Sequence, residues 1–192
     1  MHRRISSLSG LVLLSGLAFG LAACSPLPVA QRAPFLPPGV YGTYEDNDTG
    51  AINQSAWAFA SPANTRGNPV DAAKAIVALE YLSGELRQNP RWVGLPASVK
   101  LHMARARDEL RQIVGIRPDA SSQMAVNALL ALALDLETEN QPAAMAVLQS
   151  PVFIRPPEET LRVLSNLPYV QEANLATARA EAGAFPVSGP NS

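Results

Sequence analysis

The sequence is poor in the residues that most often build catalytic and metal sites. Its 192 residues include one cysteine and two histidines, and only His102 lies beyond the first few positions. One histidine without a second thiol cannot supply the usual ligand sets for zinc, and a single cysteine cannot form a disulfide within the chain. The sequence also has no phosphate-binding glycine loop and no dinucleotide fingerprint. We therefore expect no metal, no cofactor and no enzymatic activity.

The chain has no excess of positive charge. It carries 15 Lys and Arg against 16 Asp and Glu, whereas nucleic-acid-binding domains usually present a basic stripe. No nucleic-acid partner is expected. Charge is uneven along the sequence, however, because residues 85–117 are net positive and residues 119–182 net negative. We favour complementary faces within the fold or ordinary solvated surfaces; the alternative is that Arg105, Arg107 and Arg111 dock an acidic partner or an anionic envelope polymer.

No apolar run is long enough to span a bilayer, which takes about 20 residues. The longest candidate, residues 11–21, is interrupted by serine and glycine. It follows Arg3 and Arg4 and ends in small residues, which is the layout of a secretory signal peptide. We therefore assign residues 1–23 to a signal peptide, and a retained signal anchor is the less favoured alternative.

The segment Leu21-Ala22-Ala23-Cys24 directly follows this apolar run. It resembles the lipobox of bacterial lipoproteins, in which a leucine and two small residues precede an obligatory cysteine. The resemblance implies that a dedicated peptidase cuts before Cys24 and that its sulfur carries a diacylglyceryl group. Two or three acyl chains hold a protein on a membrane effectively permanently, because each buried methylene contributes about 0.8 kcal/mol.

Residue Ser25 bears on which membrane carries the anchor. In well-studied Gram-negative bacteria, an aspartate directly after the lipidated cysteine tends to keep lipoproteins in the inner membrane. With serine at this position, the resemblance implies a location in the cell envelope at the outer membrane, facing the periplasm. The sequence is also compatible with a Gram-positive source, which has a single membrane.

Residues 24–67 are predicted to form the lipidated cysteine and a flexible tether. Five prolines lie within residues 25–38, and such a density removes backbone donors and favours extended polyproline geometry. Residues 39–67 are rich in Gly, Asn, Ser and Thr and lack helical periodicity. We expect this part to be irregular, with some of it lying against the domain.

The run from Asp46 to Gly50 has the alternating carboxylates of a calcium loop. It departs from the EF-hand pattern where that pattern is most constrained, because its twelfth position is Trp57 and not glutamate. We therefore favour a solvated turn, with a short hairpin about Asp48-Thr49-Gly50 as one form it could take.

Residues 68–182 predict an all-α fold, an irregular bundle of about five or six helices, followed by a disordered tail over residues 183–192. Asn68 is a plausible cap, and prolines in the first turn mark several helix starts. The helix over residues 120–139 is apolar nearly all round, so we expect it to be central and the most buried. The predicted helices are 69–88, 96–114, 120–139, 142–149, 157–165 and 168–182.

His102 is the one candidate for acid–base catalysis, with Ser98 and Asp108 near it in sequence. A hydrolytic triad needs a nucleophile, a base and an orienting acid held together by the fold. Positions 98, 102 and 108 do not share one face of a helix. We therefore favour a partly exposed histidine on a helix surface.

Four aromatic residues, Tyr41, Tyr44, Trp57 and Phe59, lie in the predicted tether. They could stack on the sugar rings of envelope glycans, but packing against the helical domain is the simpler role, since each can bury about 150–250 Å². Arg91 and Trp92, between two predicted helices, are expected to make a core or lid contact of the same kind.

Taken together, the residues favour a membrane-anchored, periplasm-facing lipoprotein with a non-catalytic helical domain for interaction or structural support. Its expected partners are the membrane, through lipid on Cys24, and a protein of the cell envelope. The alternatives are a glycan-binding module that uses the aromatic residues and, less favoured, a hydrolase that uses His102.

Overall fold

A computed structural model describes residues 32–42 and 46–186. The signal peptide, the lipobox with Cys24, Tyr44 and residues 187–192 of the predicted tail lie outside this part of the chain. The described residues form seven α-helices and two short 3-10 helices, which confirms the predicted all-α bundle. The elements are α1 Asn47–Ala60, η1 Pro62–Asn64, α2 Pro69–Gln88, η2 Pro90–Trp92, α3 Ala97–Val114, α4 Ser122–Glu137, α5 Gln141–Leu148, α6 Pro157–Ser165 and α7 Gln171–Ala184.

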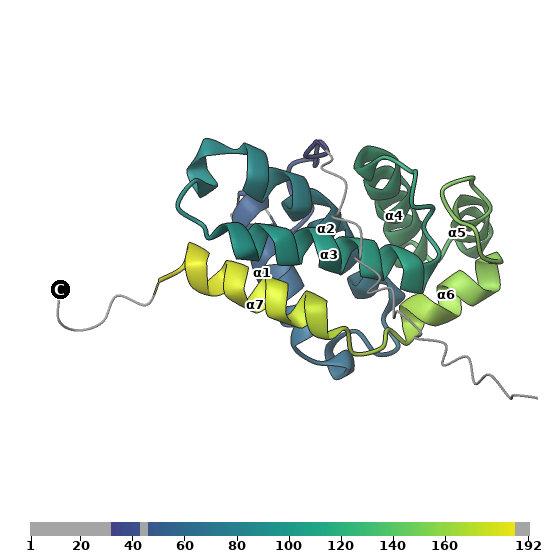
Figure 1. The fold of residues 1–192 in the computed structure, drawn as a ribbon. Coiled ribbons are helices and arrows are strands. Elements are labelled where there is room, and N and C mark those ends of the chain that lie inside the picture. Colours follow the sequence, from purple (N-terminus) through teal and green to yellow (C-terminus); the bar gives the residue numbers. More distant parts are fainter. Residues whose placement is uncertain (1–31, 43–45, 187–192) are drawn as a thin grey trace, which may run out of the picture.

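The bundle is built around α2. This helix contacts α1, α3, α4 and α6, and every residue from 75 to 84 is buried. Asn68 caps its first turn as predicted, since the Asn68 side chain accepts a hydrogen bond from the backbone N–H of Asp71 at 3.1 Å. Figure 1 shows α1 and α7 together at one end of the molecule and α4 and α5 at the other. None of the described helices is both long and apolar enough to cross a membrane.

The prediction that residues 120–139 form the most buried helix is wrong. Among the described helices, α4 packs only on α2 and α5, so its remaining side faces away from the bundle. Met124 and Leu134 on that side are 47% and 59% exposed. The central position belongs to α2, which is covered by four helices.

The prediction of irregular structure across residues 39–67 is also wrong, because residues 47–60 form α1. Asp46 caps this helix, since its carboxylate accepts a hydrogen bond from the backbone N–H of Thr49 at 3.0 Å. Ile52 and Phe59 are buried, and α1 packs against both α2 and α7. The helical fold therefore begins well before residue 68, and Asp48-Thr49-Gly50 form the first turn of a helix instead of a hairpin.

The end of the predicted tether is docked on the bundle. The side-chain amide of Gln123 in α4 accepts a hydrogen bond from the Phe35 N–H at 2.6 Å and donates one to the Phe35 carbonyl at 3.1 Å. Leu36 is only 3% exposed. On α2, Gly84 allows the backbone of Ala33 to approach so closely that a Cβ at position 84 would lie 2.5 Å from it. Residues 33–36 are thus part of the folded domain.

Candidate functional site

The predicted lipid attachment site, Cys24, lies outside the described residues, as do Leu21, Ala22 and Ala23. The first described residue, Arg32, follows Cys24 by eight positions. Lipidation therefore stays a prediction from the sequence. The structure shows where the chain that follows Cys24 joins the bundle, which is at residues 33–36 on α2 and α4.

His102 lies on α3 and contacts α7. Its Nδ1 is 2.7 Å from Oε1 of Glu172, and the two side chains are 21% and 24% exposed. This agrees with a partly exposed histidine on a helix surface. The acid beside it is not Asp108, whose carboxylate accepts hydrogen bonds from Arg107. The structure thus pairs His102 with a residue 70 positions later, which no local sequence pattern could indicate.

The His102–Glu172 pair resembles one half of a catalytic triad, because a carboxylate at Nδ1 fixes the imidazole tautomer and orientation. The remaining requirement is a nucleophile at Nε2. Ser98, one turn earlier on the same helix, is exposed. What the pair does in the fold is join α3 to α7, which pack along each other.

Two of the three arginines considered as a docking surface are buried. The side chains of Arg107 and Arg111 are 2% and 3% exposed, and of the three only Arg105 is exposed. The hypothesis that these three dock an acidic partner is therefore wrong. On a helix, positions 107 and 111 follow the buried Met103 by one and two turns, so they lie at the border of its buried face.

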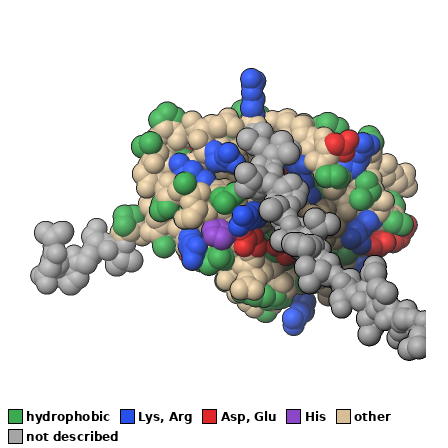
Figure 2. Space-filling view, viewed as in Figure 1, with side chains coloured by type: hydrophobic (Ala, Val, Ile, Leu, Met, Phe, Trp, Pro, Cys, Tyr) green, Lys and Arg blue, Asp and Glu red, His purple; other side chains and the backbone are tan. Residues whose placement is uncertain are grey.

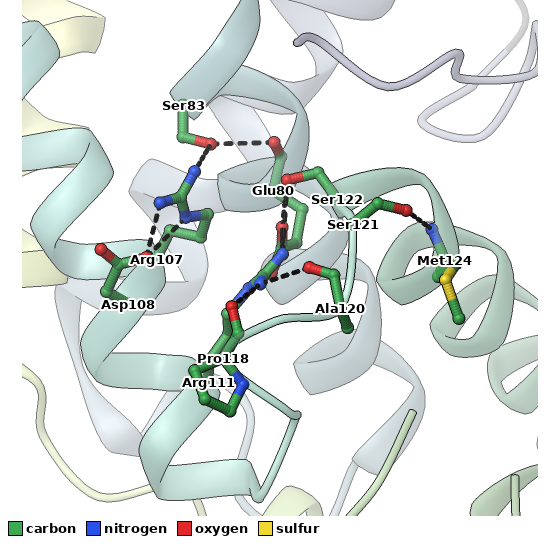
Figure 3. Close-up of polar contacts among 10 residues, drawn as sticks. All are labelled: Glu80, Ser83, Arg107, Asp108, Arg111, Pro118, Ala120, Ser121, Ser122 and Met124. Carbon is green, nitrogen blue, oxygen red and sulfur yellow. Dashed lines mark hydrogen bonds and ion pairs between the residues drawn. The ribbon is translucent and has the colours of Figure 1, made fainter. Parts of the chain in front are cut away.

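Arg111 forms a buried ion pair with Glu80 of α2 (Figure 3). Its Nε and Nη2 donate to the two carboxylate oxygens of Glu80 at 2.6 and 2.7 Å. The Ser122 hydroxyl donates to Glu80 Oε2 at 2.7 Å, and Arg111 Nη1 donates to the Ala120 carbonyl at 2.8 Å. This cluster joins α2, α3 and the start of α4, and a bidentate pair of this kind is among the stronger hydrogen-bonding arrangements.

Arg107 extends the polar interior along α3 (Figure 3). Its Nε and Nη2 donate to Asp108 Oδ1 at 2.8 and 2.6 Å, and its Nη1 lies 3.4 Å from the Ser83 hydroxyl. Of the seven basic residues in the segment 85–117, Arg107 and Arg111 are therefore buried inside the bundle. Their partners, Asp108 and Glu80, do not come from the acidic segment 119–182.

Asp48 is buried at the N-terminal end of α1, which makes the solvated-turn interpretation wrong. Tyr81 Oη donates to its Oδ1 at 2.6 Å and Trp92 Nε1 to its Oδ2 at 2.9 Å. Burial, followed by the hydrogen bond to Asp48, raises the pKa of the Tyr81 hydroxyl above its usual value. The contact of Trp92 with the core, predicted from the sequence, is confirmed at 7% exposure.

Arg91 covers the Asp48 carboxylate on its solvent side. Its Nη1 lies 3.0 Å from Asp46 Oδ1 and 3.4 Å from Asp48 Oδ2, and its guanidinium carbon is 4.8 Å from the centre of the Trp92 ring. The Thr49 N–H and the Arg91 guanidinium lower the pKa of Asp46 against the opposing effect of burial. The carboxylates of the suspected calcium loop therefore hold α1 on α2 and η2. No cluster of three metal-ligating residues occurs among residues 32–42 and 46–186.

The aromatic residues of the predicted tether divide into two groups. Phe59 is 6% exposed, and Tyr41 packs against the core with its hydroxyl donating to the Lys74 carbonyl at 3.0 Å. Burial raises the pKa of the Tyr41 hydroxyl. These two have the packing role that we favoured. Trp57 is different, because it is 44% exposed on α1.

On the face shown in Figure 2, hydrophobic side chains occur at several separate places with Lys and Arg between them.

No family model matches the chain, and no curated protein or solved structure is significantly similar to it.

Proposed function

We propose that the chain is a bacterial lipoprotein, anchored in the cell envelope through lipid on Cys24, and that its helical bundle acts by binding or structural support. The observation that carries this proposal is the lipobox-like segment ending at Cys24, placed directly after an apolar run with a basic start. The outer membrane, facing the periplasm, is the proposed location.

A non-catalytic role is supported by how the reactive side chains are used. Glu80, Arg107 and Arg111 are buried in one polar interior, and Asp48 holds α1 through Tyr81 and Trp92. His102 joins two helices through Glu172. Each of these groups has a structural partner, which leaves the outer surface of the bundle to act on other molecules.

The anchor is tested by replacing Cys24 with alanine in the native host. A thioether lipid cannot form on alanine, so the variant is expected either to move almost completely from the detergent-soluble membrane fraction to the soluble periplasm or to remain as an uncut precursor in the inner membrane. The measurements are membrane fractionation, with a sucrose gradient to separate inner and outer membranes, and intact mass of the wild-type protein.

The matched control is Ser25→Ala, which keeps the cysteine and is expected to remain acylated and membrane-bound. Unchanged processing together with unchanged fractionation of Cys24→Ala would contradict the proposal. A wild-type mass without added acyl chains would contradict it independently.

A second candidate, a glycan-binding module, is favoured by the exposed indole of Trp57. Its backbone is held from the following turn, because Asn64 Nδ2 donates to the Trp57 carbonyl at 2.5 Å. If this side chain stacks on a sugar ring, Trp57→Ala should reduce retention on purified peptidoglycan about tenfold, the equivalent of roughly 1.4 kcal/mol. Phe185→Ala, at another exposed aromatic residue, is the control. Equal retention of wild type and both variants would remove this candidate.

A further inference from the structure

The outer side of α4 carries a continuous exposed stripe. Met124, Asn127, Ala131 and Leu134 are spaced by three, four and three residues, which places them on one face of the helix. All four are exposed, Met124 and Leu134 by 47% and 59%. Since α2 and α5 are the only described helices that contact α4, no described helix is packed on this stripe.

Phe35 extends the stripe at the start of α4. Its side chain is 69% exposed, while its backbone is fixed by the two hydrogen bonds to the Gln123 amide. Gln123 Nε2 also donates to Asn127 Oδ1 at 2.8 Å, so the phenylalanine lies beside the stripe. We call the surface formed by Phe35, Met124, Asn127, Ala131 and Leu134 the α4 edge.

The charge of this region suits a negatively charged surface. Residues 32–42 and 120–134 contain no aspartate or glutamate, and Arg32 is exposed where the described chain begins. Anionic lipid headgroups attract cations such as Arg32 and repel carboxylates. The α4 edge itself carries no charged side chain. Arg32 lies near its start, and the first carboxylate of α4, Asp135, follows Leu134 at its far end.

The length of chain between Cys24 and Arg32 limits how far the start of the α4 edge can lie from the proposed lipid. Arg32 follows Cys24 by eight positions, and a fully extended chain covers at most about 3.6 Å per residue, so roughly 29 Å is the longest separation. That is about the diameter of a small domain. Because residues 33–36 are docked on α2 and α4, this limit applies to the start of the α4 edge, and Leu134 lies farther along the helix.

We propose that the α4 edge rests on the lipid surface that holds the anchor, with Phe35, Met124 and Leu134 inserted at the boundary between headgroups and acyl chains. This inference rests on the proposed function, because lipid on Cys24 brings the bundle to the membrane. The apolar contact adds to the anchor in proportion to the area that it buries, and it fixes which side of the bundle points away from the membrane.

The test places a nitroxide at single introduced cysteines in the lipidated, full-length protein. Thioether-linked Cys24 does not react with the label. The variants are Phe35→Cys, Met124→Cys and Leu134→Cys, with Val93→Cys and Tyr169→Cys as controls at exposed positions outside α4 and its two contacting helices. Each labelled protein is reconstituted into vesicles of phosphatidylethanolamine and phosphatidylglycerol, and relaxation by oxygen and by a water-soluble nickel complex is measured.

We expect the labels at positions 35, 124 and 134 to respond to oxygen and to be shielded severalfold from nickel, while the two controls respond to nickel. Equal access of nickel to all five labels, in vesicles that carry the protein on flotation, overturns the α4 edge proposal and leaves the anchor standing. Nickel shielding confined to the stripe in detergent as well would identify a protein contact instead and also overturn it. Failure of the wild-type protein to float overturns both proposals.

Discussion

Glu80→Ala is expected to lower the free energy of unfolding by about 3–5 kcal/mol, because it leaves Arg111 as an uncompensated buried cation. The wild-type carboxylate is fully buried and receives the Arg111 guanidinium and the Ser122 hydroxyl. Removing it breaks the connection between α2, α3 and the start of α4 in one step. Urea denaturation followed by circular dichroism measures the loss.

The matched control is Lys74→Ala, which removes the surface ion pair with Glu137, whose two side chains are 26% and 42% exposed. An exposed pair contributes about 0–1 kcal/mol, so little change is expected. The double variant Glu80→Leu with Arg111→Met should recover most of the stability lost in Glu80→Ala, since a packed apolar pair avoids the cost of desolvating charge. A loss below 1 kcal/mol in Glu80→Ala would show that the interior pair is hydrated.

Gly84→Ala is expected to destabilise the protein by about 1–3 kcal/mol and to release residues 33–36. The new Cβ would lie 2.5 Å from backbone atoms of Ala33, which cannot turn aside as a side chain can. Helix propensity acts in the opposite direction, because alanine is favoured over glycine by about 1 kcal/mol inside a helix. A net loss of stability therefore means that displacing the docked segment costs more free energy than the gain in helix propensity provides.

Release of this segment is measured by the rate of tryptic cleavage after Arg32, located by mass spectrometry, and by exchange of the Phe35 amide hydrogen. Both should become several times faster in Gly84→Ala. The control is Gly183→Ala, where the nearest atom is the end of the flexible Leu95 side chain. Stabilisation of Gly84→Ala with unchanged cleavage would contradict the docked arrangement.

Helix periodicity and first-turn proline were sufficient to predict some elements. The bounds of α2 and α6 agree with the predicted residues 69–88 and 157–165, since both helices combine proline in the first turn with a regular apolar pattern. The helix α1 was missed because Asp46 to Gly50 is rich in residues typical of turns. In the structure, α2 and α7 provide the apolar surfaces on which this segment becomes helical, and those contacts are distant in sequence.

Buried charge was the second feature that local patterns could not show. An arginine on an amphipathic helix is normally assigned to the solvent side, and Arg107 and Arg111 were assigned in this way. Their burial depends on partners on another helix, such as Glu80, which lies 31 positions before Arg111. The position of Glu172 beside His102 was hidden for the same reason.

The high proportion of apolar residues in α4 was visible in the sequence, but it was attributed to burial at the centre of the bundle. A helix that is hydrophobic all round is typical of a protein core, and this argument predicted a central helix. The structure places the helix at the periphery, where Met124 and Leu134 are exposed. The same composition also fits a helix with one side for the bundle and another for an apolar surface outside it.

The packing of α1 on α7 has a consequence for how the chain acquires its structure. These two helices are the earliest and the latest in the described sequence, yet they share one interface. During vectorial synthesis or secretion, α1 emerges long before its second neighbour exists. The complete core can therefore close only after residues 171–184 have been delivered.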